Sequence, residues 1–231
     1  MKKYARIFMS LLLSVSFFSL TPSFSSIKAE ERPAYTIEEI NGRDQIVDTF
    51  GKTHELYYAN GEKVPLDYAL SVLNNDDLIK ANNSVSTKSM PLRGPIAPDT
   101  VSLNSKSSYY AGRVRVTPYV TGLATITYGQ SSTVSESFGG KISISASVKG
   151  MIIAQAGAQF GLTWNSTASS NSSFSASFTI PSEKTGAVYF RAKMIRVSGS
   201  YYNSQLKAYY VYGDTPAMVG SFADGIYEVV Y

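Results

Sequence analysis

The chain has 231 residues, of which 21 are basic and 17 are acidic, with one histidine and no cysteine. The lack of cysteine excludes disulfide bonds, a thiolate nucleophile, cysteine-ligated metal sites and a lipoprotein anchor. Because His54 is the only histidine, a metal site with two histidine ligands is also excluded.

The first 29 residues have the order of a secretory signal peptide. A basic start is followed by an apolar stretch from residue 7 to about residue 20, and a short polar region ends at Ala29. The apolar stretch is shorter than the roughly 20 residues that a membrane-spanning helix needs. We therefore expect cleavage near Ala29 and secretion, and the composition suggests an extracellular bacterial protein.

Removal of this signal would change the charge balance. The remaining chain would carry 17 basic and 17 acidic residues, so the basic pI gives no reason to expect a nucleic-acid partner. Residues 30–100 contain 12 acids and 7 bases, whereas residues 101–231 contain 5 acids and 10 bases. The two parts can attract each other, or the second can favour anionic surfaces.

Residues 30–81 are predicted to form a small acidic segment with short strands and one helix. The pieces YTIEEI, QIVDTF and HELYYA are typical of strands, and Asn60-Gly61 indicates a turn. Leucines at roughly helical spacing from Leu66 to Leu78 follow Pro65, which suits the first turn of a helix. Residues 82–108, with three prolines in MPLRGPIAPD, are predicted to be a linker or an extended strap.

From Tyr109 to Tyr231 the sequence predicts antiparallel strands and no helix. Tyrosine, valine, threonine and serine dominate this part, as is usual in strands. The predicted fold class is therefore all-β, mainly antiparallel and either elongated or sandwich-like, with one short helix in the N-terminal region.

Within residues 139–164, every second residue from Ile142 to Trp164 is apolar apart from Gly150, and mostly polar residues lie between them. The apolar positions are Ile142, Ile144, Ala146, Val148, Ile152, Ala154, Ala156, Ala158, Phe160 and Leu162, and the polar positions are Lys141, Ser143, Ser145, Ser147, Gln155, Gln159 and Thr163. Because one flat strand of this length would aggregate, we expect a hairpin. Its tip would be Lys149, Gly150 and Met151, with Gly150 in the left-handed position of a three-residue turn.

Two interpretations of this hairpin are open. In the first, the apolar side faces the core of a β-sandwich and the serines face water, as is common in antiparallel sheets. In the second, the hairpin inserts into a membrane, because each arm reaches the 9–11 residues that a spanning strand needs. The apolar positions would then face lipid and the polar positions a lumen.

The order of features from residue 109 onward resembles the aerolysin-like β-pore-forming family, including its epsilon-toxin and mosquitocidal-toxin branch. The resemblance lies in the amphipathic stretch SSTVSESFGGKISISASVKGMIIAQAGAQFGLTW and in the following SFSASFTIPSEKTGAVYFRAKMIRVSG. It implies an elongated all-β body, homo-oligomerisation on a target membrane and insertion of one hairpin per subunit. The chain departs from the family pattern because it is short, has no identifiable receptor-binding head, and residues 30–100 do not look like a known lectin module.

The sequence gives no sign of an enzyme, a cofactor site or a metal site. No serine lies in a G-x-S-x-G motif, His54-Glu55 lacks the second histidine of a zinc protease, and no phosphate-binding glycine loop is present. His54 is therefore interpreted as a surface residue of a strand. Candidate residues for binding a lipid surface or a receptor are Tyr109, Tyr110, Tyr201, Tyr202, Arg113, Arg115 and Arg191. The alternative is that these tyrosines pack on the sheet and these arginines are solvated.

Two functions remain open at this point. The first is a secreted, non-enzymatic, membrane-active protein of the pore-forming type. The second is a cell-envelope or matrix β-sandwich that binds a polymer or a protein and forms no pore. Substitution of an apolar hairpin residue by aspartate distinguishes them, because only the first predicts leakage of vesicles that the substitution abolishes.

Overall fold

The computed structural model describes residues 34–74, 98–127, 131–170, 177–205 and 207–231. The chain divides into Met1–Arg32 and Pro33–Tyr231, and all described residues belong to the second unit. The predicted signal peptide, Leu78, and residues 82–97 of the predicted linker lie outside the described residues.

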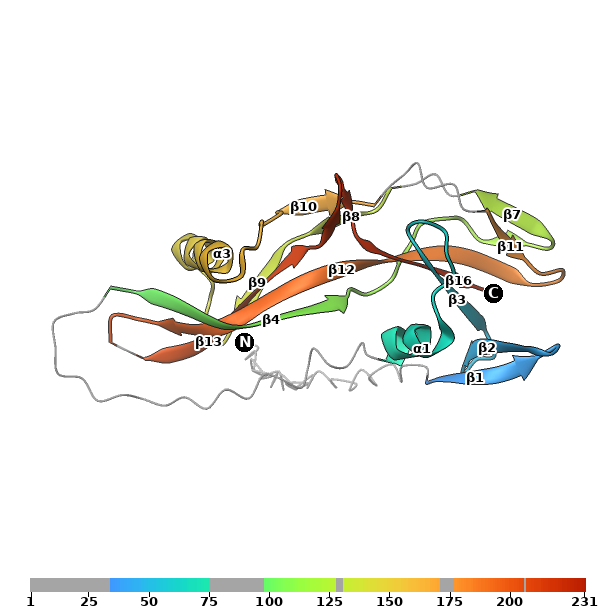
Figure 1. The fold of residues 1–231 in the computed structure, drawn as a ribbon, viewed down its shortest axis with the longest axis horizontal. Coiled ribbons are helices and arrows are strands. Elements are labelled where there is room, and N and C mark those ends of the chain that lie inside the picture. Colours follow the sequence, from blue (N-terminus) through green and yellow to red (C-terminus); the bar gives the residue numbers. More distant parts are fainter. Residues whose placement is uncertain (1–33, 75–97, 128–130, 171–176, 206) are drawn as a thin grey trace, which may run out of the picture. The chain divides into compact units, whose positions relative to one another are not determined.

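The described unit is mostly antiparallel β-sheet, which confirms the predicted fold class (Figure 1). Its main sheet has ten strands. They are β1 (Tyr35–Ile40), β2 (Arg43–Asp48), β3 (Thr53–Tyr58), β4 (Thr100–Tyr110), β5 (Val114–Arg115), β6 (Val120–Thr121), β9 (Ser137–Gly140), β12 (Thr185–Tyr202), β13 (Ala208–Pro216) and β16 (Gly225–Val230). The predicted pieces YTIEEI, QIVDTF and HELYYA supply β1, β2 and β3.

The sheet is organised around β12, which has 18 residues and pairs along both edges. One edge pairs first with β16 and then with β13. The other edge pairs in turn with β6, β5 and β4, which follow one another backwards along the chain. Because β12 links all these strands, elements far apart in sequence meet on it (Figure 1).

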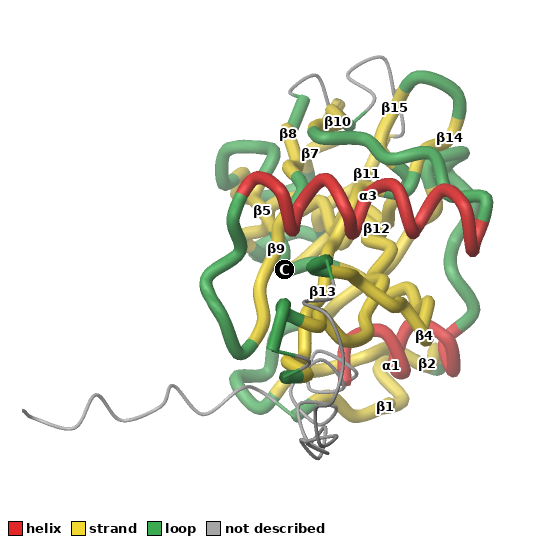
Figure 2. Tube along the Cα trace, turned by 90° about the vertical axis from the view of Figure 1, so that its left-hand side faces the viewer, coloured by secondary structure: helices red, strands yellow, loops and turns green. Residues whose placement is uncertain are grey.

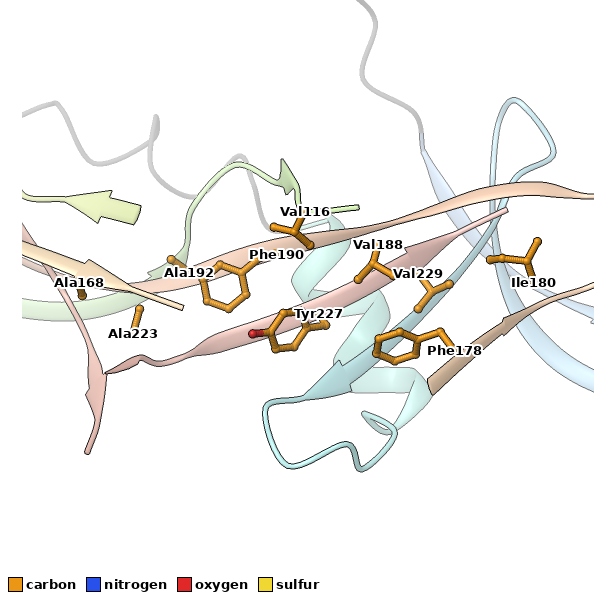
Figure 3. Packing of buried hydrophobic residues seen from close by; sticks show 10 residues of the cluster. All are labelled: Val116, Ala168, Phe178, Ile180, Val188, Phe190, Ala192, Ala223, Tyr227 and Val229. Atoms are coloured by element: carbon orange, nitrogen blue, oxygen red, sulfur yellow. The ribbon is translucent and has the colours of Figure 1, made fainter. Parts of the chain in front are cut away.

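Three two-stranded sheets accompany the main sheet. They are β8 (Thr133–Ser135) with β10 (Thr167–Ser169), β7 (Ala124–Thr127) with β11 (Ser177–Ile180), and β14 (Met218–Val219) with β15 (Phe222–Ala223). In Figure 3, Val188 and Phe190 of β12 lie beside Tyr227 and Val229 of β16, and Phe178 of β11 packs with this group. These residues belong to the largest of three buried apolar clusters.

Two helices are described, α1 (Leu66–Asn74) and α3 (Ala146–Phe160). The first begins directly after Pro65, as predicted, and buries Ala69, Val72 and Leu73. Within the described residues, neither helix has the length and apolarity to cross a membrane.

The structure corrects two predictions of local structure. Thr100–Tyr110, most of which falls in the predicted linker, is a strand that pairs with β12 over ten residue positions. The prediction of no helix after Tyr109, and with it the hairpin over residues 139–164, is wrong for this structure. Ser137–Gly140 is strand β9, and Ala146–Phe160 is helix α3. Both errors have one cause, since each segment takes its conformation from a sheet surface built by distant strands.

Candidate functional site

The candidate functional site is α3 together with the sheet surface that holds it. Ser145 caps the start of the helix, since its hydroxyl accepts a hydrogen bond from Val148 N at 3.3 Å. Gly161 ends the helix in the left-handed conformation, with φ of 60°. Serine before and glycine after an alanine-rich stretch were signals of a helix that the alternating pattern concealed.

The helix attaches to the sheet through one narrow stripe. Val148, Ile152 and Ala156 are four residues apart, so they lie on one face of the helix, and they are 4%, 0% and 0% exposed. They pack with Leu103 of β4, Val197 of β12 and Val211 of β13. In Figure 1 α3 is seen nearly end-on above horizontal strands, and Figure 2 shows it lengthwise, so it runs across the strand direction.

The alternating pattern fits both a strand and this helix. Residues four apart lie on one face of a helix, and in a strand they also lie on one face, with one residue of that face between them. The buried stripe is therefore every second residue of the predicted apolar face. The even-numbered positions between them are Ala146, Gly150, Ala154 and Ala158, which are small and exposed in the helix. Residues 146–158 can therefore present a strand face to lipid or a helix stripe to the sheet.

The predicted hairpin residues are thus placed differently from the expectation. Of the apolar set, Val148, Ile152 and Ala156 are buried, Ile142, Ile144, Phe160 and Leu162 are partly buried against the same cluster, and Ala146, Ala154 and Ala158 are exposed. Of the polar set, Lys141, Ser143, Ser145, Ser147, Gln159 and Thr163 are exposed and Gln155 is half-buried. The predicted tip of Lys149, Gly150 and Met151 lies inside α3 and forms no turn.

Glu136, between β8 and β9, binds one residue in the first turn of α3 and one just after its end. Its Oε1 accepts a hydrogen bond from Lys149 Nζ in α3, and its Oε2 accepts one from Trp164 Nε1 at 2.5 Å. Burial alone would raise the pKa of Glu136, but the hydrogen bonds from Lys149 and Trp164 outweigh it and lower that pKa. Phe138 lies between the two partners, stacked on Trp164 at 5.2 Å and 5.0 Å from Lys149 Nζ.

Glycines of the sheet make room for these rings. A Cβ atom on Gly213 of β13 would lie 2.7 Å from Trp164 Cη2, 3.0 Å from Phe138 Cε1 and 3.1 Å from Ile152 Cγ2. Beside the side chains on which α3 packs, Gly213 leaves bare backbone, and the fit of the two rings and of Ile152 depends on its missing side chain.

A second group of charges is buried beside β16 and was not expected. Glu228 is 0% exposed, and it meets His54 Nδ1 at 2.8 Å, Arg113 Nη1 at 2.9 Å and Arg191 Nε at 2.6 Å. His54 Nε2 lies 3.1 Å from Asp48 Oδ2. The predictions that His54 is a surface residue and that Arg191 binds at the surface are therefore wrong.

Burial alone would raise the pKa of Glu228, but the hydrogen bond from His54 and the charges of Arg191 and Arg113 lower it to about 2. This group is a buried ionic network whose charged side chains bind one another. Its role is structural, because it ties β3, β12 and β16 together.

The remaining predicted surface residues fall in two places. Arg113 and Arg115 are exposed, near the β6 end of the sheet, whereas Tyr109 and Tyr110 are half-buried at the end of β4. Tyr201 and Tyr202 are half-buried at the far end of β12, where Tyr201 donates to Asp99 Oδ2 at 2.7 Å. The structure does not bring these residues together into one site.

Within the described residues, no group of three or more histidine, aspartate or glutamate side chains is arranged to hold a metal ion. No family model matches the chain, and no match was found among curated proteins or solved structures. The resemblance to the aerolysin-like family therefore stays a prediction, and function must be inferred from the geometry above.

Proposed function

We propose that the chain is a secreted, non-enzymatic, membrane-active protein of the pore-forming type. In this proposal, α3 belongs to the form before insertion. Residues 141–164 leave the sheet and enter the bilayer as an amphipathic hairpin in a membrane-bound form. The observation that carries the proposal is the double pattern of residues 146–158, which meets the demands of a helix stripe and of a lipid-facing strand with the same side chains.

The connection to β9 supports this change of form. Gly140 pairs with Val211, and Lys141 N donates to Tyr210 O at 2.9 Å, so the strand is already one residue longer than β9 itself. An opened α3 would let residues 141–143 continue along the same edge of β13, opposite Tyr210, Tyr209 and Ala208. The even-numbered residues would then lie on the same side of the sheet as Gly140.

The fully buried stripe of α3 is small, and partly buried side chains and the contacts of Glu136 add to its attachment. Burial of Val148, Ile152 and Ala156 contributes on the order of 4–6 kcal/mol. Gly150 and Gly157 lie inside the helix, and each costs about 0.5–1 kcal/mol relative to alanine. Unpaired strand edges are costly in lipid, so insertion requires several copies whose hairpins pair with each other.

Two neighbouring exposed residues of α3 test the proposal. Ala158 and Gln159 both face water in the described form, so an aspartate at either position leaves the fold intact. In the inserted hairpin Ala158 faces lipid and Gln159 faces the lumen. We expect Ala158→Asp to abolish release of an encapsulated dye from phospholipid vesicles and Gln159→Asp to preserve it. Equal effects of the two variants would contradict the hairpin.

A second function is favoured by the tight packing of α3 against the sheet. The stripe of Val148, Ile152 and Ala156 is as buried as a permanent core. A cell-envelope or matrix module that binds a polymer needs no more than this fixed surface. In that case wild-type protein releases no dye at any lipid composition, and both aspartate variants behave as the wild type does.

A further inference from the structure

Large apolar side chains are exposed at one end of the main sheet. Phe50 is 72% exposed, Leu123 is 78%, Tyr119 is 55% and Val114 is 52%. They come from the turn between β2 and β3, the turn after β6, the segment before β6, and β5. Together with Lys52, Arg115, Lys184 and Tyr189 we call them the basic aromatic end.

Strand pairing shows that these turns are neighbours. Thr53, at the start of β3, donates to Tyr231 O at 2.8 Å, and Val230 pairs with Ala187 near the start of β12. Thr185 pairs in turn with Thr121 at the end of β6. Four adjacent strand ends lie side by side, so the turns that carry Phe50 and Leu123 are about 15 Å apart.

The cations at this end are held in place by tyrosine rings. The Arg115 guanidinium lies 4.6 Å from the Tyr119 ring centroid, and the Arg113 guanidinium lies 4.7 Å from that of Tyr189. The two tyrosine hydroxyls are 3.1 Å apart. Hydrogen bonds with Tyr189 and Arg115 lower the pKa of Tyr119, and Lys52 is close enough to lower it further.

The end is predominantly positive. None of Lys52, Arg115 and Lys184 forms an ion pair with a described carboxylate. Asp48 is buried and accepts from Phe50 N and Lys52 N, both at 2.9 Å, so its charge stabilises the turn. Glu183 is the exposed carboxylate of these turns within the described residues.

We propose that the basic aromatic end docks on the headgroup layer of an anionic phospholipid membrane. Apolar side chains at the tips of turns enter the interface, tyrosines lie at headgroup level, and lysines and arginines are attracted to anionic lipid. The Arg115 guanidinium lies against the Tyr119 ring and forms no ion pair with a described carboxylate, which suits an anionic headgroup better than the apolar face of a neutral sugar.

The docking surface and α3 are separable. Tyr189 and Val197, which belong to the two sites, are eight residues apart on β12, or about 26 Å. The inference deepens the proposed membrane activity, on which its biological role rests. Binding to vesicles is nevertheless measurable without leakage, so each proposal can fail alone.

Cosedimentation of the full chain with vesicles tests the docking. Vesicles of phosphatidylcholine with phosphatidylglycerol are compared with phosphatidylcholine alone, at low and high salt. We expect binding to the anionic vesicles that weakens at high salt. Lys52→Gln and Arg115→Gln should each lower the partition coefficient about fivefold. The double variant Phe50→Ser/Leu123→Ser should lower it at least tenfold.

Matched controls lie away from this end. Lys207→Gln removes an exposed lysine beyond the far end of β12, and Val219→Ser removes an exposed apolar side chain of β14. Both should bind as the wild type does, and circular dichroism checks that every variant is folded.

The proposal is overturned if binding is absent, if it is equal for both lipid compositions, or if the controls lose as much binding as the variants. Binding to a soluble anionic polymer but to neither vesicle also overturns it. Retained binding without dye release contradicts only the pore.

Discussion

Lys149 in the first turn of α3 and Glu136 before β9 form an ion pair that crosses from the helix to the strand beside it. The same carboxylate accepts a hydrogen bond from Trp164, so one side chain holds the helix and the segment that follows it. Glu136 is the only acid between residues 100 and 182, and it interrupts the polar and apolar alternation. Its position in the structure lets it hold α3 and Trp164 beside β9.

Glu136→Gln should therefore loosen α3. The variant keeps the size of the side chain but removes the charge that attracts Lys149, and opening of the helix should become easier by about 1–2 kcal/mol. Hydrogen exchange of the amides in α3 should accelerate roughly 5- to 30-fold, and dye release should begin at lower protein concentration. Glu39→Gln, at an exposed position of β1, is the control and should leave both measurements unchanged.

Gly150→Ala should have the opposite effect. Nothing lies within 4 Å of the position of the added Cβ, so the methyl group stabilises α3 by about 0.5–1 kcal/mol without a clash. The same change strains the left-handed position that Gly150 would take at the tip of an inserted hairpin. We expect slower hydrogen exchange in α3 and slower dye release.

The reverse substitution in the same helix serves as its control. Ala154 is exposed, and Ala154→Gly should accelerate exchange by a similar factor. If Gly150→Ala speeds dye release, the helix is not the form that must open.

Gly213→Ala tests the seat of the helix. The added methyl group would meet Trp164, Phe138 and Ile152, which must all move, at a cost of about 1–3 kcal/mol. Trp164 is the only tryptophan, so tryptophan emission excited selectively over the tyrosines reports on this site alone. We expect a shifted emission spectrum and a lower melting temperature. Gly112→Ala, which meets nothing within 4 Å, should change neither, and an unchanged spectrum for Gly213→Ala would show that the rings are not seated as described.

The buried network predicts a loss of stability in acid. The pKa of Glu228 is about 2 in the folded protein and close to its ordinary value of 4.5 in the unfolded chain. The unfolded chain therefore binds a proton first as the pH falls. The stabilisation by Glu228 is complete above about pH 4.5 and is lost progressively toward pH 2. Asp48, whose pKa is also lowered, contributes in the same direction.

Glu228→Gln isolates this contribution. The variant leaves the buried Arg191 without its carboxylate partner at 2.6 Å, so the free energy of unfolding at pH 7 should fall by about 3–5 kcal/mol. Urea unfolding measured between pH 7 and pH 2 should show a flatter pH dependence than in the wild type. A slope as steep as that of the wild type would show that other carboxylates cause the acid loss.

Much of the fold follows from local sequence. The strands β1, β2 and β3 lie where their β-rich pieces predict them, and α1 begins after Pro65 because proline suits a first helical turn. Antiparallel structure follows from short, alternating segments without long helical periods.

Residues 141–164 show what local sequence left open. Their alternation establishes an amphipathic segment, but a spacing of four residues belongs to both a strand face and a helix stripe. The tertiary structure decides for the helix, because Leu103, Val197 and Val211, from three different strands, form a surface that matches Val148, Ile152 and Ala156. Gly213 leaves room for the rings beside it.

The charged residues divide in the same way. The sequence shows that His54, Arg191 and Glu228 exist, and strand propensity places each in a strand. Only the pairing of β16 with both β3 and β12 brings them together, across 174 positions in the case of His54 and Glu228. A buried charge is stable only beside its partner, and that partner is supplied by the topology of the sheet.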